Sequence, residues 1–176
     1  MFGKTISLQD KRSQLHQLFV ATLKQVYSTE KELVHVLITL QEEAGSRPVK
    51  FALQDRRTEA LNHQEKLENI FRLVGQEPDT LKCRAVKGLL KEANELVDET
   101  DAQSITRDVA LVSTGRNIGH YKISLYTTLL QLASSLGISG AVNLLSDVLR
   151  EEKDAELLLT EMSQSLINKL SVEKPV

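Results

Sequence analysis

The sequence predicts an all-α fold, an antiparallel four-helix bundle with one long crossover that carries a short extra helix. Apolar residues recur every three or four positions in long segments, which is the periodicity of a helix with one buried face. Only 8 Gly and 3 Pro occur among 176 residues, too few for an all-β chain with its frequent turns. Four long segments separated by two short links and one long central link indicate a bundle with one crossover.

The first two long helices are predicted from about Leu8 to Glu43 and from about Pro48 to Gly75. Gly45 and Ser46 break the periodicity between them, and a proline suits the first turn of the helix that follows. A glycine is common just after the last helical turn, so Gly75 marks the end of the second helix. The short extra helix, about Leu81 to Val97, lies within the crossover.

The other two long helices are predicted from about Ser104 to Leu136 and from Gly140 to about Leu170, with Gly137 ending the first of them. Since short links pair the first helix with the second and the third with the fourth, the chain reads as two helical hairpins in tandem. We expect residues 1–170 to form a single domain and residues 171–176 to form a flexible C-terminal tail.

Charge and composition argue against several classes of partner. A formal net charge of −2 gives no basic surface for nucleic acid or anionic membranes. No run approaches the roughly 18 apolar residues of a membrane span, and the first residues lack the apolar region of a signal peptide. The single cysteine, Cys83, cannot form an internal disulfide. We therefore expect a cytoplasmic protein that binds neither nucleic acid nor membranes.

Each apolar stripe is interrupted by polar residues near the middle of its helix. Glu30 lies between Val26 and Leu33 in the first helix, and His63 falls in line with Ala60 and Leu67 in the second. Because antiparallel helices place their midpoints at one level, the interrupting residues are predicted to form one polar layer. Its predicted members are Glu30, Glu59, His63, Lys122, Glu152 and Glu156.

The chemistry of such a layer has two interpretations. A buried carboxylate without a partner costs several kcal/mol, so it must be protonated, paired or bound to a cation. Two-metal bundles use a Glu from each of two helices and a Glu-x-x-His motif from the other two. The spacing of four from Glu59 to His63 and from Glu152 to Glu156 matches that motif loosely. The competing interpretation places these residues in surface ion pairs on solvated helix faces.

Five segments carry a resemblance to a known family. Residues 26–33, 81–89, 92–95, 107–111 and 151–153 resemble the bacterial YciE/YciF-type ferritin-like proteins. The likeness covers about residues 10 to 165, in order, and includes the helix within the crossover. It implies a ferritin-like four-helix bundle that forms a homodimer, is associated with stress responses and belongs to a group regarded as two-metal carboxylate proteins of uncertain activity.

Carried over residue by residue, the resemblance implies metal ligands in three of the four helices: Glu30, Glu59, His63, Glu152 and Glu156. The third helix departs from the family pattern. Where relatives read Val-Glu-His-Tyr-Glu-Ile, residues 118–123 read Ile-Gly-His-Tyr-Lys-Ile, so Gly119 and Lys122 replace two glutamates. An ammonium group in that place repels a metal cation and neutralises a carboxylate.

Two outcomes remain open for the layer. Lys122 either replaces one metal ion beside a single remaining Fe or Mn, or it bridges Glu30 and Glu152 in a layer without metal; the sequence favours the second. We therefore expect one metal ion or none per chain, no robust ferroxidase activity and no identifiable catalytic residue or substrate. The predicted function is a ferritin-like, stress-associated protein with a degenerate carboxylate and histidine metal site and without robust ferroxidase activity; the sequence favours a protein that is not an enzyme but leaves that point open. The alternative is a functional two-metal protein, with iron or manganese, in redox or storage chemistry.

Overall fold

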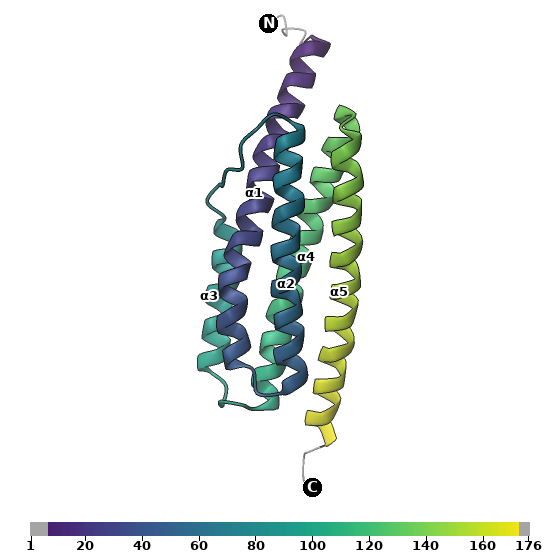
Figure 1. Cartoon of the computed structure of the whole chain (residues 1–176). Helices are drawn as coiled ribbons and strands as arrows, with labels where there is room; N and C mark the ends of the chain where they lie inside the picture. The colour runs from purple at the N-terminus through teal and green to yellow at the C-terminus, as the bar shows by residue number, and fades with distance from the viewer. Residues whose placement is uncertain (1–6, 173–176) are drawn as a thin grey trace, which may run out of the picture.

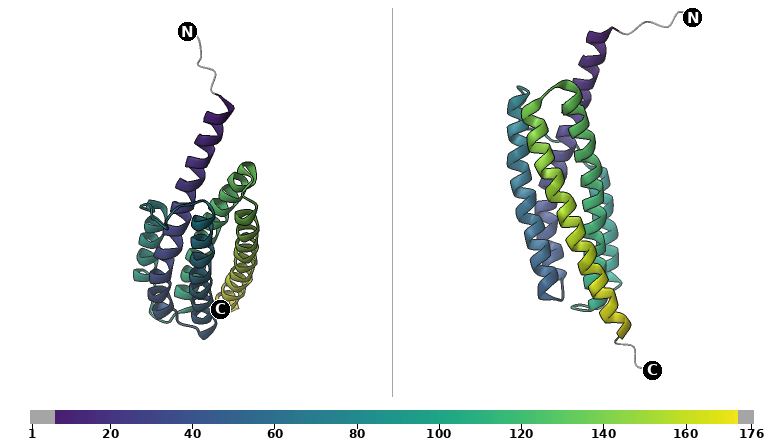
Figure 2. Two further views of the ribbon diagram at one scale, coloured as in Figure 1. Left: turned by 45° about the horizontal axis from the view of Figure 1, so that its top comes forward. Right: turned by 90° about the vertical axis from the view of Figure 1, so that its right-hand side faces the viewer.

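The computed structural model describes residues 7–172, and within that range the chain forms five helices and no strand. They are α1 (Leu8–Glu43), α2 (Arg47–Leu73), α3 (Arg84–Asp98), α4 (Ile105–Leu136) and α5 (Ser139–Val172). The four long helices lie side by side, α1 and α5 running in one direction and α2 and α4 in the other (Figure 1). The short α3 lies along α1 and α4 (Figures 1 and 2). The predicted all-α class is confirmed.

The helix ends follow from local hydrogen bonding. Ser7 and Asp10 form a capping box at the start of α1, in which each side chain accepts a backbone N–H of the other residue. Gly137 ends α4 with φ of 73°, a left-handed conformation that glycine adopts without steric cost. Helix α3 begins later than the predicted Leu81, because the Leu81 N–H donates to Ser28 Oγ at 2.7 Å and stays outside the helix.

The C-terminal end of α5 differs from the expected tail. The helix continues to Val172, two residues into the segment predicted to be flexible, and residues 173–176 lie outside the described range. The apolar stripe of α1 also differs at its start, because its first turns extend beyond the neighbouring helices (Figure 2). Leu15, a predicted member of that stripe, is therefore 38% exposed, and continuous burial begins near Phe19.

One buried carboxylate fixes how α4 starts against the turn between α1 and α2. Asp108 accepts the backbone N–H groups of Gly45 at 2.7 Å and Ser46 at 2.9 Å. A Cβ at position 45 would lie 2.6 Å from the carbonyl oxygen of Gln103, so the close approach of the Gln103 backbone requires glycine at this position. This tie sets the register of α4 along α1 and α2, and with it the height at which the mid-helix side chains of the three helices meet.

The buried apolar residues form two clusters along the bundle. One contains, among others, Leu33, Leu37, Leu53, Ile118 and Leu159. The other contains Val26, Leu67, Tyr126, Leu129 and Leu145, among others. Polar side chains occupy the level between these clusters, near the middle of every long helix.

Candidate functional site

Each long helix contributes a fully buried polar side chain to the centre of the bundle. Glu30 of α1, His63 of α2, Lys122 of α4 and Glu152 of α5 are each at most 1% exposed, and we call these four residues the central layer. Apolar residues about one turn away on each helix pack into the two core clusters and so direct these side chains inward. The sequence folds this way because the periodic stripe continues on both sides of each interruption.

Lys122 connects the two buried carboxylates of the layer. Its Nζ lies 2.6 Å from Glu152 Oε1 and 3.0 Å from Glu30 Oε1. The hydroxyl of Tyr126 donates to the same Glu30 oxygen at 2.6 Å. Short charge-assisted contacts of this kind are the strong ones in proteins, and here water is excluded from them.

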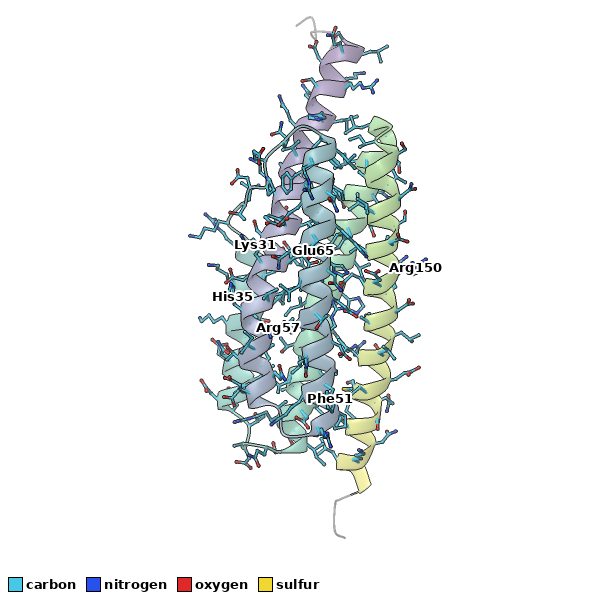
Figure 3. The ribbon with its side chains drawn as sticks, in the orientation of Figure 1. Lys31, His35, Phe51, Arg57, Glu65 and Arg150 are labelled. Carbon is cyan, nitrogen blue, oxygen red and sulfur yellow. The ribbon has the colours of Figure 1, made fainter. Side chains whose placement is uncertain are left out.

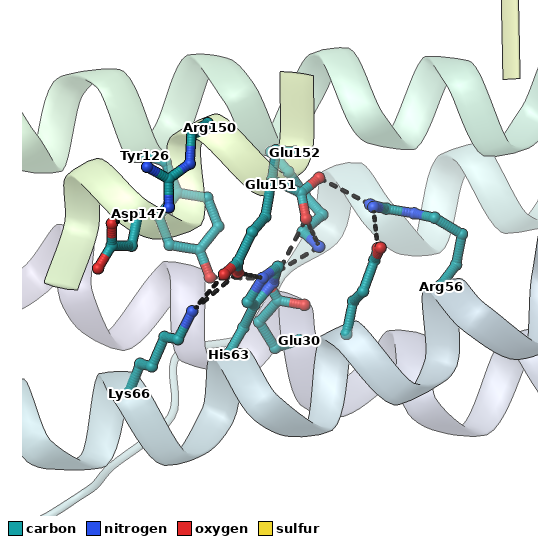
Figure 4. A network of polar contacts seen from close by, with 11 residues as sticks. Glu30, Arg56, His63, Lys66, Tyr126, Asp147, Arg150, Glu151 and Glu152 are labelled. Carbon is teal, nitrogen blue, oxygen red and sulfur yellow. Dashed lines mark hydrogen bonds and ion pairs between the residues drawn. The ribbon is translucent and has the colours of Figure 1, made fainter. Parts of the chain in front are cut away.

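Arg56 of α2 approaches Glu152 from the other side (Figure 4). Its Nη2 donates to Glu152 Oε2 at 2.7 Å, and its Nη1 donates to Glu59 Oε2. Arg56 was not among the predicted members of the layer. A signal was available, because Arg56 precedes His63 by seven residues, which is two helical turns and therefore the same face of α2.

His63 has a carboxylate beside each ring nitrogen. Nε2 lies 2.9 Å from Oε2 of Glu151, which also pairs with Lys66 at 2.8 Å (Figure 4). Nδ1 lies 3.3 Å from Glu152 and 3.4 Å from Glu30, without the alignment of a hydrogen bond. His63 Nδ1 and Glu30 Oε2 are thus buried polar atoms with no hydrogen-bond partner among the described residues.

The pKa values of the acidic groups follow from this arrangement. Burial raises the pKa of Glu30, but Lys122, His63 and Tyr126 together outweigh burial and lower it to about 2. Burial keeps the pKa of Glu59 above its usual value despite Arg56, and burial beside Glu30 raises the pKa of Tyr126 well above its usual value. Glu30 is therefore an ionised carboxylate, and Tyr126 is a neutral donor to it.

Two predicted members of the layer lie outside it. Glu59 is 34% exposed and reaches the layer only through Arg56. Glu156 is 20% exposed and pairs instead with Arg116 at 3.2 Å, His120 at 3.3 Å and Thr160 at 2.7 Å. Four residues along a helix shift a side chain by about 6 Å and about 40°, which is enough to carry Glu156 to the α4–α5 edge. The prediction of one layer of six residues is corrected to this extent.

A group of three metal-ligand side chains remains. Glu30, His63 and Glu152 each offer one ligand atom, and these atoms lie within 4.8 Å of one another. Among the other histidines, His35 points outward from α1 (Figure 3) and His120 is 59% exposed. None of the described helices is both long enough and apolar enough to cross a membrane.

Comparisons with known proteins agree with the fold and with the resemblance. The family model of a domain of unknown function, DUF892, matches residues 14–171. Protein YciF of Escherichia coli (strain K12) is 30% identical over 161 residues, which covers 91% of this chain and 96% of YciF. The crystal structure of that stress protein superposes with a TM-score of 0.83 over 88% of this chain and 98% of YciF.

Two further solved structures are similar. YcfI of Rhodopseudomonas palustris, for which a structural role has been suggested, gives a TM-score of 0.80 at 29% identity and covers 91% of this chain and 98% of its own. A protein of Xanthomonas campestris pv. campestris gives a TM-score of 0.70 at 18% identity, covering 89% and 94%, and shows the fold alone. The chain therefore belongs to the DUF892 family, the YciE/YciF-type family that its sequence resembles.

Proposed function

We propose that the chain is a non-enzymatic, stress-associated protein with the ferritin-like four-helix fold, in which side-chain charges take the place of a metal centre. The single observation that carries the proposal is the position of Lys122, whose ammonium group lies at 2.6 and 3.0 Å from the two buried carboxylates. An ammonium group held there neutralises the carboxylates that a metal ion needs as ligands. The association with stress rests on the relationship to YciF.

The residues present do not fit a two-metal centre. Two metal ions in a bundle take inward carboxylates from all four helices, with a histidine on two of them. Here α4 offers Lys122 and Gly119 in place of carboxylates, and Glu156 is engaged at the surface. Among residues 7–172 only three donors converge, and two of them already contact the ammonium group.

A single metal ion is the competing function, and one observation favours it. Glu30 Oε2 and His63 Nδ1 are buried without hydrogen-bond partners, and both belong to the group of three candidate ligands. A divalent cation between them would satisfy both atoms, but it would lie close to the Lys122 ammonium. The repulsion between the two cations in a dry interior favours the layer without metal.

Metal content tests the proposal directly. The purified chain is loaded with ferrous iron under anaerobic conditions, desalted and analysed for bound iron, and its thermal unfolding is measured with and without chelator. We expect no stoichiometric iron and no change in Tm with chelator. About one ion per chain would establish the mononuclear site, and about two would establish the two-metal alternative, against this proposal.

The homodimer and the cytoplasmic location remain predictions of the sequence and of the resemblance. Sedimentation equilibrium of the purified chain gives the mass of the assembly, and a mass twice that of the chain supports the dimer. A single folding domain over residues 1–170 is likewise a proposal, and one cooperative unfolding transition followed by two probes supports it.

A further inference from the structure

The charged side chains in the centre of the bundle form a series of ion pairs in which positive and negative groups alternate. From α1 to the α2 surface the order is Glu30, Lys122, Glu152, Arg56 and Glu59. Glu152 is the central member, and its two oxygens are divided: Oε1 faces Lys122 at 2.6 Å and Oε2 faces Arg56 at 2.7 Å. Each cation therefore shares Glu152 with the other and has one further carboxylate of its own.

This order is that of a two-cation carboxylate centre. In such a centre one carboxylate bridges the two cations and further carboxylates bind each cation at its outer side. Here Glu152 is the bridging carboxylate, Glu30 is the outer carboxylate of Lys122, and Glu59 is the outer carboxylate of Arg56. Two monovalent cations thus face three carboxylates, and the His63 ring lies beside two of the three.

We propose that Lys122 and Arg56 are two internal cations, each occupying one of the two cation positions of the centre, and that Arg56 closes the second position as Lys122 closes the first. This inference rests on the proposed function and adds a residue to it, because Lys122 alone leaves Glu59 and one oxygen of Glu152 available to a second ion. Arg56 removes both of these ligands from a metal ion. The guanidinium presents two N–H groups in a fixed fork, which suits a position between two carboxylates.

Burial supports this role for Arg56. An arginine that only covered a surface carboxylate would leave its guanidinium in water, whereas the Arg56 side chain is 10% exposed and ends on a fully buried glutamate. The neighbouring Arg57 makes no ion pair with any residue between 7 and 172, although its Nε is also buried. Arg57 as a whole is only partly buried, whereas Arg56 is buried, and Figure 3 labels Arg57 on the same helix. The two arginines thus form a matched pair on α2, of which only Arg56 contacts the centre.

The test counts metal ions as the two positions are opened one at a time. Four proteins are loaded with Mn²⁺ and desalted: the native chain, Lys122→Glu, Lys122→Glu with Arg56→Met, and Lys122→Glu with Arg57→Met. Carboxylate donors suit Mn²⁺, so we expect none, about one, about two and about one ion per chain in that order. Electron paramagnetic resonance adds a second measurement, because two neighbouring Mn²⁺ ions give a spin-coupled spectrum that a single ion does not.

The outcomes separate the two proposals. Manganese in the native chain overturns the proposed function itself. One ion in Lys122→Glu that stays at one after Arg56→Met overturns the role of Arg56 and leaves the proposed function intact, and no ion in either variant overturns the two-position centre. Circular dichroism establishes that each variant is folded. If Arg56→Met does not fold, Arg56→Gln removes the charge and keeps a hydrogen-bond donor, and the same count of two ions is expected.

Discussion

Two acidic clusters lie one helical turn apart on α5 and have opposite surroundings. Glu152 is fully buried and contacts Lys122, Arg56 and His63. Glu156 is partly exposed and contacts Arg116, His120 and Thr160. Each glutamate thus has an ion pair, a histidine and a further donor, yet only Glu152 is shielded from solvent. Burial, rather than the type or number of partners, distinguishes a candidate centre from an ordinary surface ion pair.

The difference has an energetic consequence. Buried ion pairs balance a large desolvation cost against strong attraction, so removing one partner leaves an uncompensated charge. Surface ion pairs contribute little, because water and salt screen them and because two long side chains lose freedom. Equivalent substitutions in the two clusters should therefore differ in cost by several kcal/mol.

The largest expected effect comes from Lys122→Met. This change keeps the apolar stem and leaves Glu30 and Glu152 facing each other without the ammonium group. We expect the free energy of unfolding to fall by about 3–5 kcal/mol, measured by urea unfolding at pH 7. The matched change at the surface, Arg116→Met, should cost about 0–1 kcal/mol. Equal losses in the two variants would show that the central layer is no more buried in solution than the Glu156 cluster.

Acid should lower the free energy of unfolding through protonation of Glu30 in the central layer. Its folded pKa of about 2 lies below the usual 4.5, so it contributes stability that is fully present above about pH 4.5 and is lost as the pH falls toward 2. A shift of this size corresponds to about 3 kcal/mol. Glu59, with its raised pKa, has the opposite dependence, since protonating it relieves a cost.

A difference measurement isolates the Glu30 contribution. The pH dependence of the free energy of unfolding is compared between the native chain and Glu30→Gln, so that the contribution of Glu59 is common to both. The native chain should lose more stability than the variant between pH 5 and pH 3. Parallel curves would contradict an ionised, stabilised Glu30, and Glu156→Gln serves as the surface control.

The Tyr126 hydroxyl should contribute a smaller amount. It donates to the buried Glu30 oxygen, and hydrogen bonds to charged groups are worth about 1.5–3 kcal/mol. Tyr126→Phe removes only this hydroxyl, so we expect a loss of that size in thermal or urea unfolding. Tyr27→Phe is the control, because the Tyr27 hydroxyl donates to Glu68, which is partly exposed. The free energy of unfolding should fall by less in this variant than in Tyr126→Phe. A larger loss at Tyr27 than at Tyr126 would contradict the ranking by burial.

The sequence predicted which helices supply the buried side chains of the site better than it predicted all of their partners. The apolar stripes continue on both sides of Glu30, His63, Lys122 and Glu152, so their inward direction follows from helical periodicity alone. The contact of Lys122 with both carboxylates could be expected because a buried cation and buried anions must pair. Arg56 was missed because an arginine on a long helix is usually solvated, although it falls on the face of His63.

The position of Glu156 could not be obtained from periodicity. Glu152 and Glu156 differ by about 40° around the helix axis, which is smaller than the uncertainty of an assigned helical face. What separates them is the crossing of α5 over α4, where Arg116 and His120 lie beside Glu156 at the edge. Such a distinction depends on how two helices pack, and a single stripe contains no information about it.

The smallest expected effect is a difference in how salt changes the cost of substitutions at Glu156 and at Lys122. At about 0.1 M ionic strength charges are screened over about 10 Å, and at 1 M over about 3 Å, but only where ions can approach. Glu156→Gln should cost up to about 1 kcal/mol at low salt and nothing measurable at 1 M NaCl, because Arg116 and His120 are accessible to ions. The cost of Lys122→Met should stay nearly unchanged over the same range, since the contacts that it removes exclude water and ions. Urea unfolding at the two salt concentrations gives both differences, and a cost of Lys122→Met that disappears with salt would place the central layer in contact with solvent.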